Sequence, residues 1–297
     1  MMKLTVGEEG KFTILQFTDL HVGSMPFHEH DYLTFSHLKE MTEKVDPDLI
    51  VITGDLIWSE GVRGPEKSFE ALVDVLNALH KPIAITYGNH DAEEGITRTQ
   101  LRKMEEKIEQ LVEKKHLHVV EDRASYCVEI NTKEGEVSHV LYLVDSGAID
   151  PLAIGTYEFV HPDQVTWFNE VSELYNNRDN EVKQDLLFLH IPLPEYNDAY
   201  MDAKVTGQRY ESISSPMVNT GLFTSLLLNG QVAGVFCGHD HDNDFVADYH
   251  GIKLCYGRIS GFQCYGELVR GARVIDMTND QLFETHVIET NTYRNYK

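Results

Sequence analysis

The segment Gly234–Asp244, GVFCGHDHDND, gathers side chains that bind metal ions in proteins. An apolar run ends at a glycine, and directly after it come His239, Asp240, His241, Asp242 and Asp244. Imidazole nitrogens and carboxylate oxygens are ligands for hard and borderline divalent cations. The spacing therefore indicates a metal site at the end of a strand.

Four earlier apolar runs end in polar residues of the same kinds. These ends are Asp19-Leu20-His21, Gly54-Asp55, Gly88-Asn89-His90-Asp91 and His190. Each alone has an ordinary interpretation, such as a Gly-Asn turn. In open α/β sheets, however, ligands bind just outside the carboxyl ends of the strands. We therefore expect all five ends to meet at one rim. The donor set contains no thiolate, which favours Mn, Fe or Zn.

The elements that must position these residues alternate between strand-like and helix-like segments. Expected helices cover Leu33–Val45, Glu66–Leu79, Thr97–Lys114 and His161–Tyr175. Short apolar runs between helices predict β-α-β units with buried, largely parallel strands. After Asp244 the pattern changes to two hairpins, 244–257, turning at His250-Gly251, and 271–289. We expect this antiparallel part to belong to a second sheet.

Length and charge limit the classes of function. The chain has 297 residues, 42% hydrophobic, which is enough apolar material for the single domain over 1–297 that we expect. Its net charge of −23 predicts repulsion from nucleic acid duplexes and anionic membranes. A small anionic substrate stays possible where bound cations supply local positive charge. The sequence contains no pattern that predicts the oligomeric state.

Cysteine usage and the N-terminal residues predict the compartment. Cys127, Cys237, Cys255 and Cys264 form no CxxC pair, which indicates a reducing environment. The first residues lack a basic patch followed by an apolar stretch, so no signal peptide is expected, and the predicted location is the cytoplasm. The range Glu195–Gly221 lacks clear periodicity and is either a lid over the site or a surface insertion.

The ordered motifs Asp19-x-His21, Gly54-Asp55, Gly88-Asn89-His90-Asp91, His190 and Gly238-His239-x-His241 resemble the signature of calcineurin-like metallophosphoesterases. The resemblance runs from Phe12 to at least Gly257. The tail Tyr256–Met277, YGRISGFQCYGELVRGARVIDM, looks like the intracellular branch related to purple acid phosphatases. The family implies a four-layer α-β-β-α sandwich of two mixed sheets flanked by helices, with a dinuclear metal site at the strand ends.

The resemblance also implies a role for each residue. Asp19, His21 and His241 would hold the first divalent metal, while Asn89, His190 and His239 would hold the second. Asp55 would bridge both metals, and Asp240 would point elsewhere. A bridging hydroxide would attack the phosphate ester in line, with His90 as general acid; Asn89 and His90 would contact the substrate. For Asp91 we expect a helix cap.

One position departs from the purple enzymes of this family. Their colour comes from a tyrosine bound to ferric iron three residues after the bridging aspartate, and this chain has Trp58 there. They also lack the histidine that is present here as His21. The site is therefore similar to the non-purple type. Arg98 and Arg258 are further candidates for phosphate contact, because guanidinium binds phosphate bidentately; the alternative is an ion pair for each.

The sequence thus predicts a metal-dependent phosphoric ester hydrolase with a small phosphorylated substrate, and leaves monoester or diester open. A catalytically silent binding scaffold on the same fold is the alternative from another class. Scaffolds of this fold show gaps in the ligand set, whereas here the ligands and His90 are all present. An oxidase would need a redox-tuning ligand where Trp58 stands.

Overall fold

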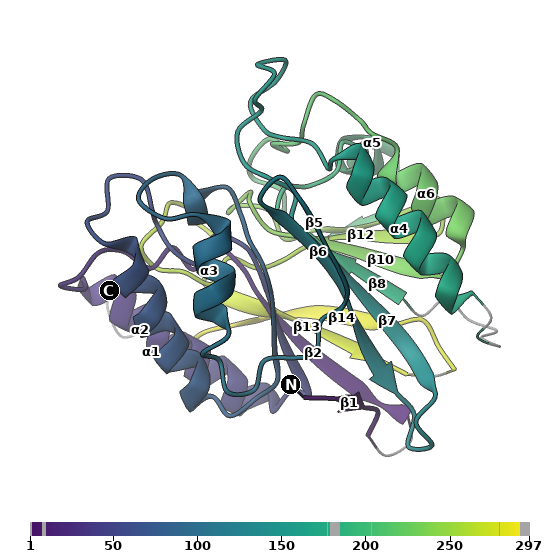
Figure 1. The fold of residues 1–297 in the computed structure, drawn as a ribbon, viewed down its shortest axis with the longest axis horizontal. Coiled ribbons are helices and arrows are strands. Elements are labelled where there is room, and N and C mark those ends of the chain that lie inside the picture. The colour runs from purple at the N-terminus through teal and green to yellow at the C-terminus, as the bar shows by residue number, and fades with distance from the viewer. Residues whose placement is uncertain are drawn as a thin grey trace.

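The structure is a computed structural model that describes residues 2–7, 10–176, 178, 185–202, 204–278 and 280–291. Two β-sheets pack face to face between two groups of helices (Figure 1). The four-layer sandwich of two mixed sheets predicted from the motifs is confirmed. Within the described ranges, no helix combines the length and the apolar composition that crossing a bilayer requires.

The first sheet has five strands in the order β14-β13-β2-β3-β4. Its centre is parallel, with β2 paired to β3 and β3 to β4, while β13 runs antiparallel to β2 and pairs with β14 on its far side. The bounds are β2 Phe12–Phe17, β3 Leu49–Thr53, β4 Ile83–Thr86, β13 Gly271–Met277 and β14 Glu284–Glu289.

The second sheet has nine strands in the order β1-β6-β7-β8-β10-β12-β11-β9, with β5 paired to β6. Here β7, β8, β10 and β12 are parallel neighbours, and β6 and β11 pair with them antiparallel. The bounds are β1 Leu4–Thr5, β5 Lys115–Val120, β6 Arg123–Asn131, β7 Val137–Val144, β8 Asp185–Phe188, β9 Lys204–Thr206, β10 Val232–Cys237, β11 Val246–Tyr249 and β12 Ile252–Tyr256.

Helices cover the outer face of each sheet. The five-stranded sheet packs against α1 Glu29–Val45, α2 Pro65–Ala78 and α3 Arg98–Glu105. The nine-stranded sheet packs against α4 Pro162–Tyr175, α5 Glu195–Asp202 and α6 Leu222–Asn229. Local sequence fixes several starts: Thr97 and His161 each form a capping box, and Pro162 opens α4 at a position that suits its fixed φ.

A third apolar core lies between the two sheets. Phe12 and Ile14 of β2 point into it, whereas Leu15 and Phe17 of the same strand pack with the helices. Because side chains alternate along a strand, β2 contributes to two cores at once, which explains why apolar residues lie on both of its faces. Phe188 and Phe236 stack across β8 and β10 with ring centroids 5.1 Å apart.

Both hairpins predicted after Asp244 form, but only one of them lies in the other sheet. β11 and β12 form the antiparallel pair expected, but β12 pairs in parallel with β10, so this hairpin belongs to the same sheet as the preceding strand. Only β13 and β14 lie in the other sheet, where β13 pairs with β2. Strand patterns predict pairing within a hairpin, while the choice of sheet depends on contacts distant in sequence.

Two segment predictions need correction. The helix expected over Thr97–Lys114 ends at Glu105, where i→i+3 bonds from Lys107 N to Met104 O and from Ile108 N to Glu105 O turn the chain. Lys114 then pairs with the buried Glu105 carboxylate at 2.8 Å. The range Glu195–Gly221 is not a structureless loop: it begins with α5 and β9, and residue 203 lies outside the described residues. After β9, it runs beside residues 240–244, where Tyr210 N donates to Asp242 O.

Candidate metal centre

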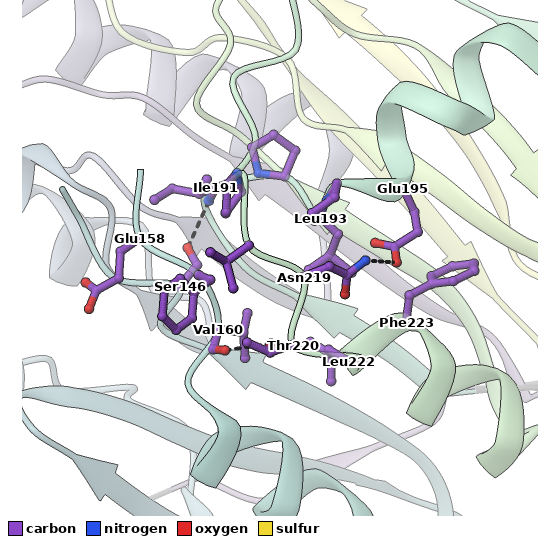
Figure 2. A pocket seen from close by; sticks show the side chains of 15 residues that line it. Ser146, Glu158, Val160, Ile191, Leu193, Glu195, Asn219, Thr220, Leu222 and Phe223 are labelled. Carbon is purple, nitrogen blue, oxygen red and sulfur yellow. Dashed lines mark hydrogen bonds between the residues drawn. The ribbon is translucent and has the colours of Figure 1, made fainter. Parts of the chain in front are cut away.

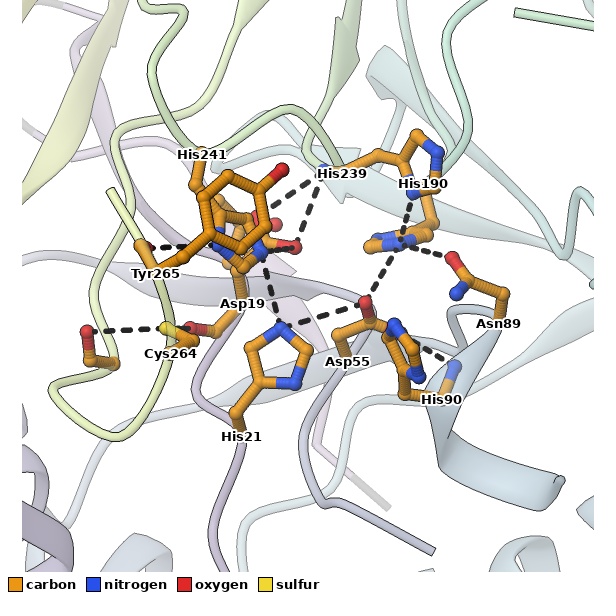
Figure 3. Close-up of polar contacts among 12 residues, drawn as sticks. Asp19, His21, Asp55, Asn89, His90, His190, His239, His241, Cys264 and Tyr265 are labelled. Atoms are coloured by element: carbon orange, nitrogen blue, oxygen red, sulfur yellow. Dashed lines mark hydrogen bonds and ion pairs between the residues drawn. The ribbon is translucent and has the colours of Figure 1, made fainter. Parts of the chain in front are cut away.

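Five strand ends deliver the predicted ligands to one place (Figure 3). From the five-stranded sheet come the residues after β2, β3 and β4, namely Asp19, His21, Asp55 and Asn89. From the nine-stranded sheet come the residues after β8 and β10, namely His190, His239 and His241. All seven side chains are buried. The structure therefore brings together every residue that the resemblance names as a ligand.

The backbone at this rim is strained. Asp19, His21, Asp55 and His239 have positive φ angles of 55°, 49°, 50° and 79°. Non-glycine residues avoid this region, and such conformations persist where the surrounding structure enforces them, often at functional sites. Two backbone bonds do so here: Asp19 N donates to Gly54 O at 3.1 Å, and His21 N donates to Asp55 O at 2.9 Å.

The glycines that precede the ligands leave no room for a side chain. A Cβ at Gly88 would lie 2.2 Å from Asp55 Oδ1, and a Cβ at Gly238 would lie 1.9 Å from Thr18 Oγ1. Both distances are far inside van der Waals contact, so any side chain at either position would displace the neighbouring loop. The Gly in each motif therefore lets a backbone approach the next ligand closely.

The first candidate metal position lies between the loops after β2 and β10. His21 Nε2 is 3.1 Å from His241 Nε2 and 3.6 Å from Asp55 Oδ2. Asp19 Oδ1 is 3.6 Å from His241 Nε2. Two ligand atoms about 2.1 Å from one cation and at right angles to each other lie about 3.0 Å apart. These donors therefore fit one divalent cation.

The second position lies between the loops after β4, β8 and β10. His190 Nε2 is 3.1 Å from Asn89 Oδ1, 3.1 Å from Asp55 Oδ2 and 3.3 Å from His239 Nδ1. Asp55 Oδ1 accepts a hydrogen bond from His90 N at 2.9 Å, which leaves Oδ2 facing both positions. That one oxygen lies near His21 and His190 alike, as a bridging ligand requires.

Burial and charge set the protonation of the imidazoles. Burial lowers the pKa of His21 and of His239 to about 3, so both are neutral near pH 7, as metal ligands must be. For His190, burial acts in the same direction, but the charge of Asp55 prevails and raises its pKa to about 9. A cation bound at this position would therefore displace a proton from His190.

Partners behind the ligands fix two ring orientations. His190 Nδ1 lies 2.8 Å from Thr53 O, and His241 Nδ1 lies 3.0 Å from Tyr265 O. Each carbonyl accepts from an Nδ1–H, which leaves Nε2 as the lone-pair donor toward the metal position. Metal-ligating histidines commonly bond in this way, and the bond increases their basicity.

His90 lies beside the ligand cluster and not within it. Its side chain is 28% exposed, and its Nδ1 lies 2.9 Å from Glu93 Oε1. Its ring meets the Trp58 ring edge-on at 4.4 Å between centroids. Glu93 is a partner that the sequence reasoning missed, although its i, i+3 spacing from His90 places the two on one face of a helical turn. A carboxylate at Nδ1 leaves Nε2 to serve a substrate.

Asp91 differs from the prediction of a helix cap. Its carboxylate accepts backbone hydrogen bonds from Leu56 at 2.7 Å, from Ile57 at 3.1 Å and from Gly88 at 2.7 Å. It thus ties the loop after β3 to the loop after β4. The prediction for Asp240 agrees with the structure, since its carboxylate accepts from Ser214 N and Tyr256 OH and faces away from the metal positions.

The two arginine candidates lie in buried ion pairs. Arg98 Nε donates to Asp145 at 2.9 Å, and its Nη2 donates to Gly88 O at 2.9 Å. Arg258 pairs with Asp244 and Glu289. Of the two alternatives, the structure shows the ion pair for each arginine, and both pairs are buried. Arg98 also supports the backbone at Gly88, and Arg258 joins the end of β12 to its neighbours.

A small, mostly apolar cavity lies next to the loop after β8 (Figure 2). Its lining includes Ile191, Leu193, Val160 and Phe223, and none of the seven predicted ligands. Ser146 Oγ accepts from Ile191 N at 2.9 Å, which fixes the residue that follows the ligand His190. The cavity therefore borders the metal centre without containing its chemistry.

Residues 12–243 match the calcineurin-like phosphoesterase family. Among relatives, Probable inactive purple acid phosphatase 14 of Arabidopsis thaliana is 31% identical, over 95% of this chain and 78% of its own length. Phosphatase DCR2 of Saccharomyces cerevisiae is 29% identical, over 86% of this chain and 49% of its own length. The chain is thus similar to proteins named inactive and to one named a phosphatase.

Solved structures share the fold at low identity. A dimetal phosphatase from Danio rerio is 13% identical with a TM-score of 0.57, covering 93% of this chain and 98% of that chain. GAP50, the anchor in the inner membrane complex of Plasmodium, is 9% identical with a TM-score of 0.57, covering 95% of this chain and 85% of that chain. From the match over residues 12–243, the chain belongs to the calcineurin-like phosphoesterase family.

Proposed function

We propose that this chain hydrolyses phosphate esters with two bound divalent cations, Mn, Fe or Zn, held by the seven converging ligands. The observation that carries the proposal is the position of Asp55 Oδ2, 3.6 Å from His21 Nε2 and 3.1 Å from His190 Nε2, where it faces both half-sites. Two such cations, when bound, supply a hydroxide nucleophile at neutral pH and neutralise the phosphoryl oxygens.

The side chains of this chain have separate roles in the reaction. Asn89, the two aspartates and the four ligand imidazoles hold the cations, and the partly exposed His90 beside them faces the substrate. His90, outside the ligand set and held by Glu93 at 2.9 Å, donates a proton to the leaving oxygen. A positioned general acid contributes about 10²–10⁴-fold to the rate. Trp58 packs on both His21 and His90 and fixes their relative placement.

The rival function is a scaffold without catalysis. It gains weight from the names of the Arabidopsis relatives and from the anchor protein that shares the fold. In this chain, however, the ligands and the acid occupy one buried cluster with the spacing that divalent cations need. A chain that served only as a surface would have no use for four strained ligand backbones.

The cellular setting follows from the same proposal. Three of the four free cysteines are buried and Cys264 is half-buried, which supports a reducing compartment such as the cytoplasm. The net charge of −23 of the whole chain favours a small phosphorylated substrate over a polyanion. We propose that the 297 residues act as one unit in this reaction.

A substrate panel tests the proposal. The purified chain is loaded with Mn²⁺, Fe²⁺ or Zn²⁺ and assayed on phosphate monoesters, linear and cyclic diesters, and pyrophosphate. We expect turnover on at least one ester class and its loss on chelation. The matched control is Asp55→Asn under identical loading. Turnover equal to that of the control on every ester, with two metals bound to the unmodified chain, would establish the scaffold instead.

A further inference from the structure

Three aromatic rings pack on histidines of the metal centre, each from a different segment. Trp58 lies 4.2 Å from the His21 ring between centroids. Tyr157 meets the His239 ring edge-on at 4.3 Å, and Tyr265 stacks on the His241 ring at 4.0 Å. Trp58 and Tyr157 are half-buried, and Tyr265 is 58% exposed. These rings therefore stand between the buried ligands and solvent.

The loop that carries Tyr157 is held rigidly. Asp150 accepts backbone hydrogen bonds from Leu152, Ile154 and Gly155 at 2.8, 2.9 and 2.8 Å. Ile149 forms a β-bridge with Tyr157. A ring fixed in this way loses little entropy when a ligand packs on it. The loop also exposes Ile149, Leu152 and Ile154, so an apolar surface continues outward from Tyr157.

Tyr265 is held on the other side. Its carbonyl oxygen faces His241 Nδ1 at 3.0 Å, and its hydroxyl donates to Glu211 Oε2 at 3.0 Å. Figure 3 shows its ring lying over the His241 ring. The bond to Glu211 holds the ring in place, while the support of His241 comes from the Tyr265 backbone and does not depend on the ring.

The charged side chains bonded to the Tyr265 hydroxyl and to His90 are carboxylates, while the buried Arg270 donates to the Tyr265 backbone oxygen at 3.2 Å. Glu211 accepts from the Tyr265 hydroxyl, and Glu93 lies against His90. A second anionic group on a substrate would meet them in a chain of net charge −23. An uncharged flat group would instead lie on aromatic faces and would leave the carboxylates solvated.

We propose that Tyr157 and Tyr265 form an aromatic mouth that selects phosphate esters of flat aromatic alcohols and disfavours alcohols with further anionic groups. The inference rests on the proposed function and names its substrate class. Packing between aromatic rings contributes about 2- to 10-fold in affinity beyond the area buried. The mouth therefore adjusts selectivity, while the metal centre supplies the binding common to all phosphate groups.

Calorimetric binding of phosphonates tests the inference without turnover. Phenylphosphonate and methylphosphonate share the group that binds metal, and only the first has a ring. On the chain loaded with two equivalents of Mn²⁺, we expect phenylphosphonate to bind more tightly. In Tyr265→Leu and in Tyr157→Leu, phenylphosphonate affinity should fall about 2- to 10-fold, with methylphosphonate within about twofold of the unmodified chain.

Tyr32→Leu is the matched control, since Tyr32 is 57% exposed on α1 and packs on Phe27 and Phe35. This substitution should leave both affinities unchanged. Equal affinities of the unmodified chain for the two phosphonates, or equal losses for both in the mouth variants, would overturn the inference alone. Failure of both phosphonates to bind the loaded chain would overturn the proposed function and the inference with it.

Discussion

The two sheets contribute different chemistry to the metal centre. The five-stranded sheet supplies all of its oxygen donors, from Asp19, Asp55 and Asn89, together with His21, whereas the nine-stranded sheet supplies imidazoles only. Loops of the first sheet are tied to one another by Asp91 and by backbone bonds between Asp19 and Gly54. The oxygen ligands therefore all come from one sheet, and three of the four imidazoles come from the other.

This difference shows what the metals would do for the fold. Each candidate position takes ligands from both sheets: His21 faces His241 at the first, and Asn89 faces His190 at the second. Bound cations thus link the two halves of the sandwich at their rim. Asp55, which faces both metal positions, belongs to the five-stranded sheet. Substitutions of ligands from the two sheets should therefore have unequal effects on metal binding.

The largest effect is expected for Asp55→Asn. The substitution removes the charge that faces both metal positions, so both metals should be lost. Metal affinity should fall by more than the roughly 10–100-fold typical of groups behind the ligands, and turnover should fall alike for good and poor leaving groups. Metal analysis with paired assays is the measurement. His239→Asn changes a ligand from the other sheet and should lose the second metal alone. Loss of both metals would show that substitutions in the two sheets do not differ in this way.

His90→Asn should separate catalysis from metal binding. Both metals should stay, because His90 lies outside the ligand cluster, and turnover of an ester with a poor alkoxide leaving group should fall about 10²–10⁴-fold. A nitrophenolate ester scarcely needs a proton, so its loss should be much smaller. The ratio of the two losses is the readout. Equal losses at full metal content would show that His90 only positions the phosphate.

Removal of metal should destabilise the fold, since the cations join the sheets. A ligand at 100 times its Kd stabilises by about 2.7 kcal/mol per site, so two filled sites would contribute about 5 kcal/mol. Unfolding in denaturant, measured with saturating Mn²⁺ and then with chelator, gives the difference. Asp55→Asn serves as control and should show little response to chelation. Superimposable curves for the unmodified chain would mean that metals do not link the sheets.

The smallest of these effects concerns Glu93, which orients the acid. Glu93→Gln should retain metals and lower turnover of poor leaving groups by about 10-fold, since the amide still contacts His90 Nδ1 without the charge. Nitrophenolate ester turnover should hardly change. Steady-state assays on both esters measure this. A loss as large as that of His90→Asn would give Glu93 a direct role in proton transfer.

Local sequence was enough to predict that the seven proposed ligands meet at one rim, but not to predict how the strands divide between the two sheets. A ligand such as Asp19 or His190 directly follows an apolar run, so its position relative to its own strand is encoded within a few residues. The pairing of β12 with β10, and of β13 with β2, joins segments by register and packing that no short pattern contains. The hairpins were therefore predictable, and their sheets were not.

The residues around the ligands show the same limit. Glu93 was within reach of prediction because three residues separate it from His90 on a helical turn. Tyr157 and Tyr265 lie in irregular segments, and only the folded chain places them on His239 and His241. The sequence left two alternatives open for Arg98 because a guanidinium suits phosphate and carboxylate equally well, and its burial against Asp145 shows the ion pair.

The central claim is that two metals, together, make this chain a hydrolase. Its most direct test is the rate of nitrophenyl phosphate hydrolysis by metal-free protein as Mn²⁺ is added in measured equivalents. The account predicts little activity up to one equivalent and a rise that ends near two, because attack requires both positions around Asp55. Binding of two equivalents without hydrolysis above that of Asp55→Asn would contradict it.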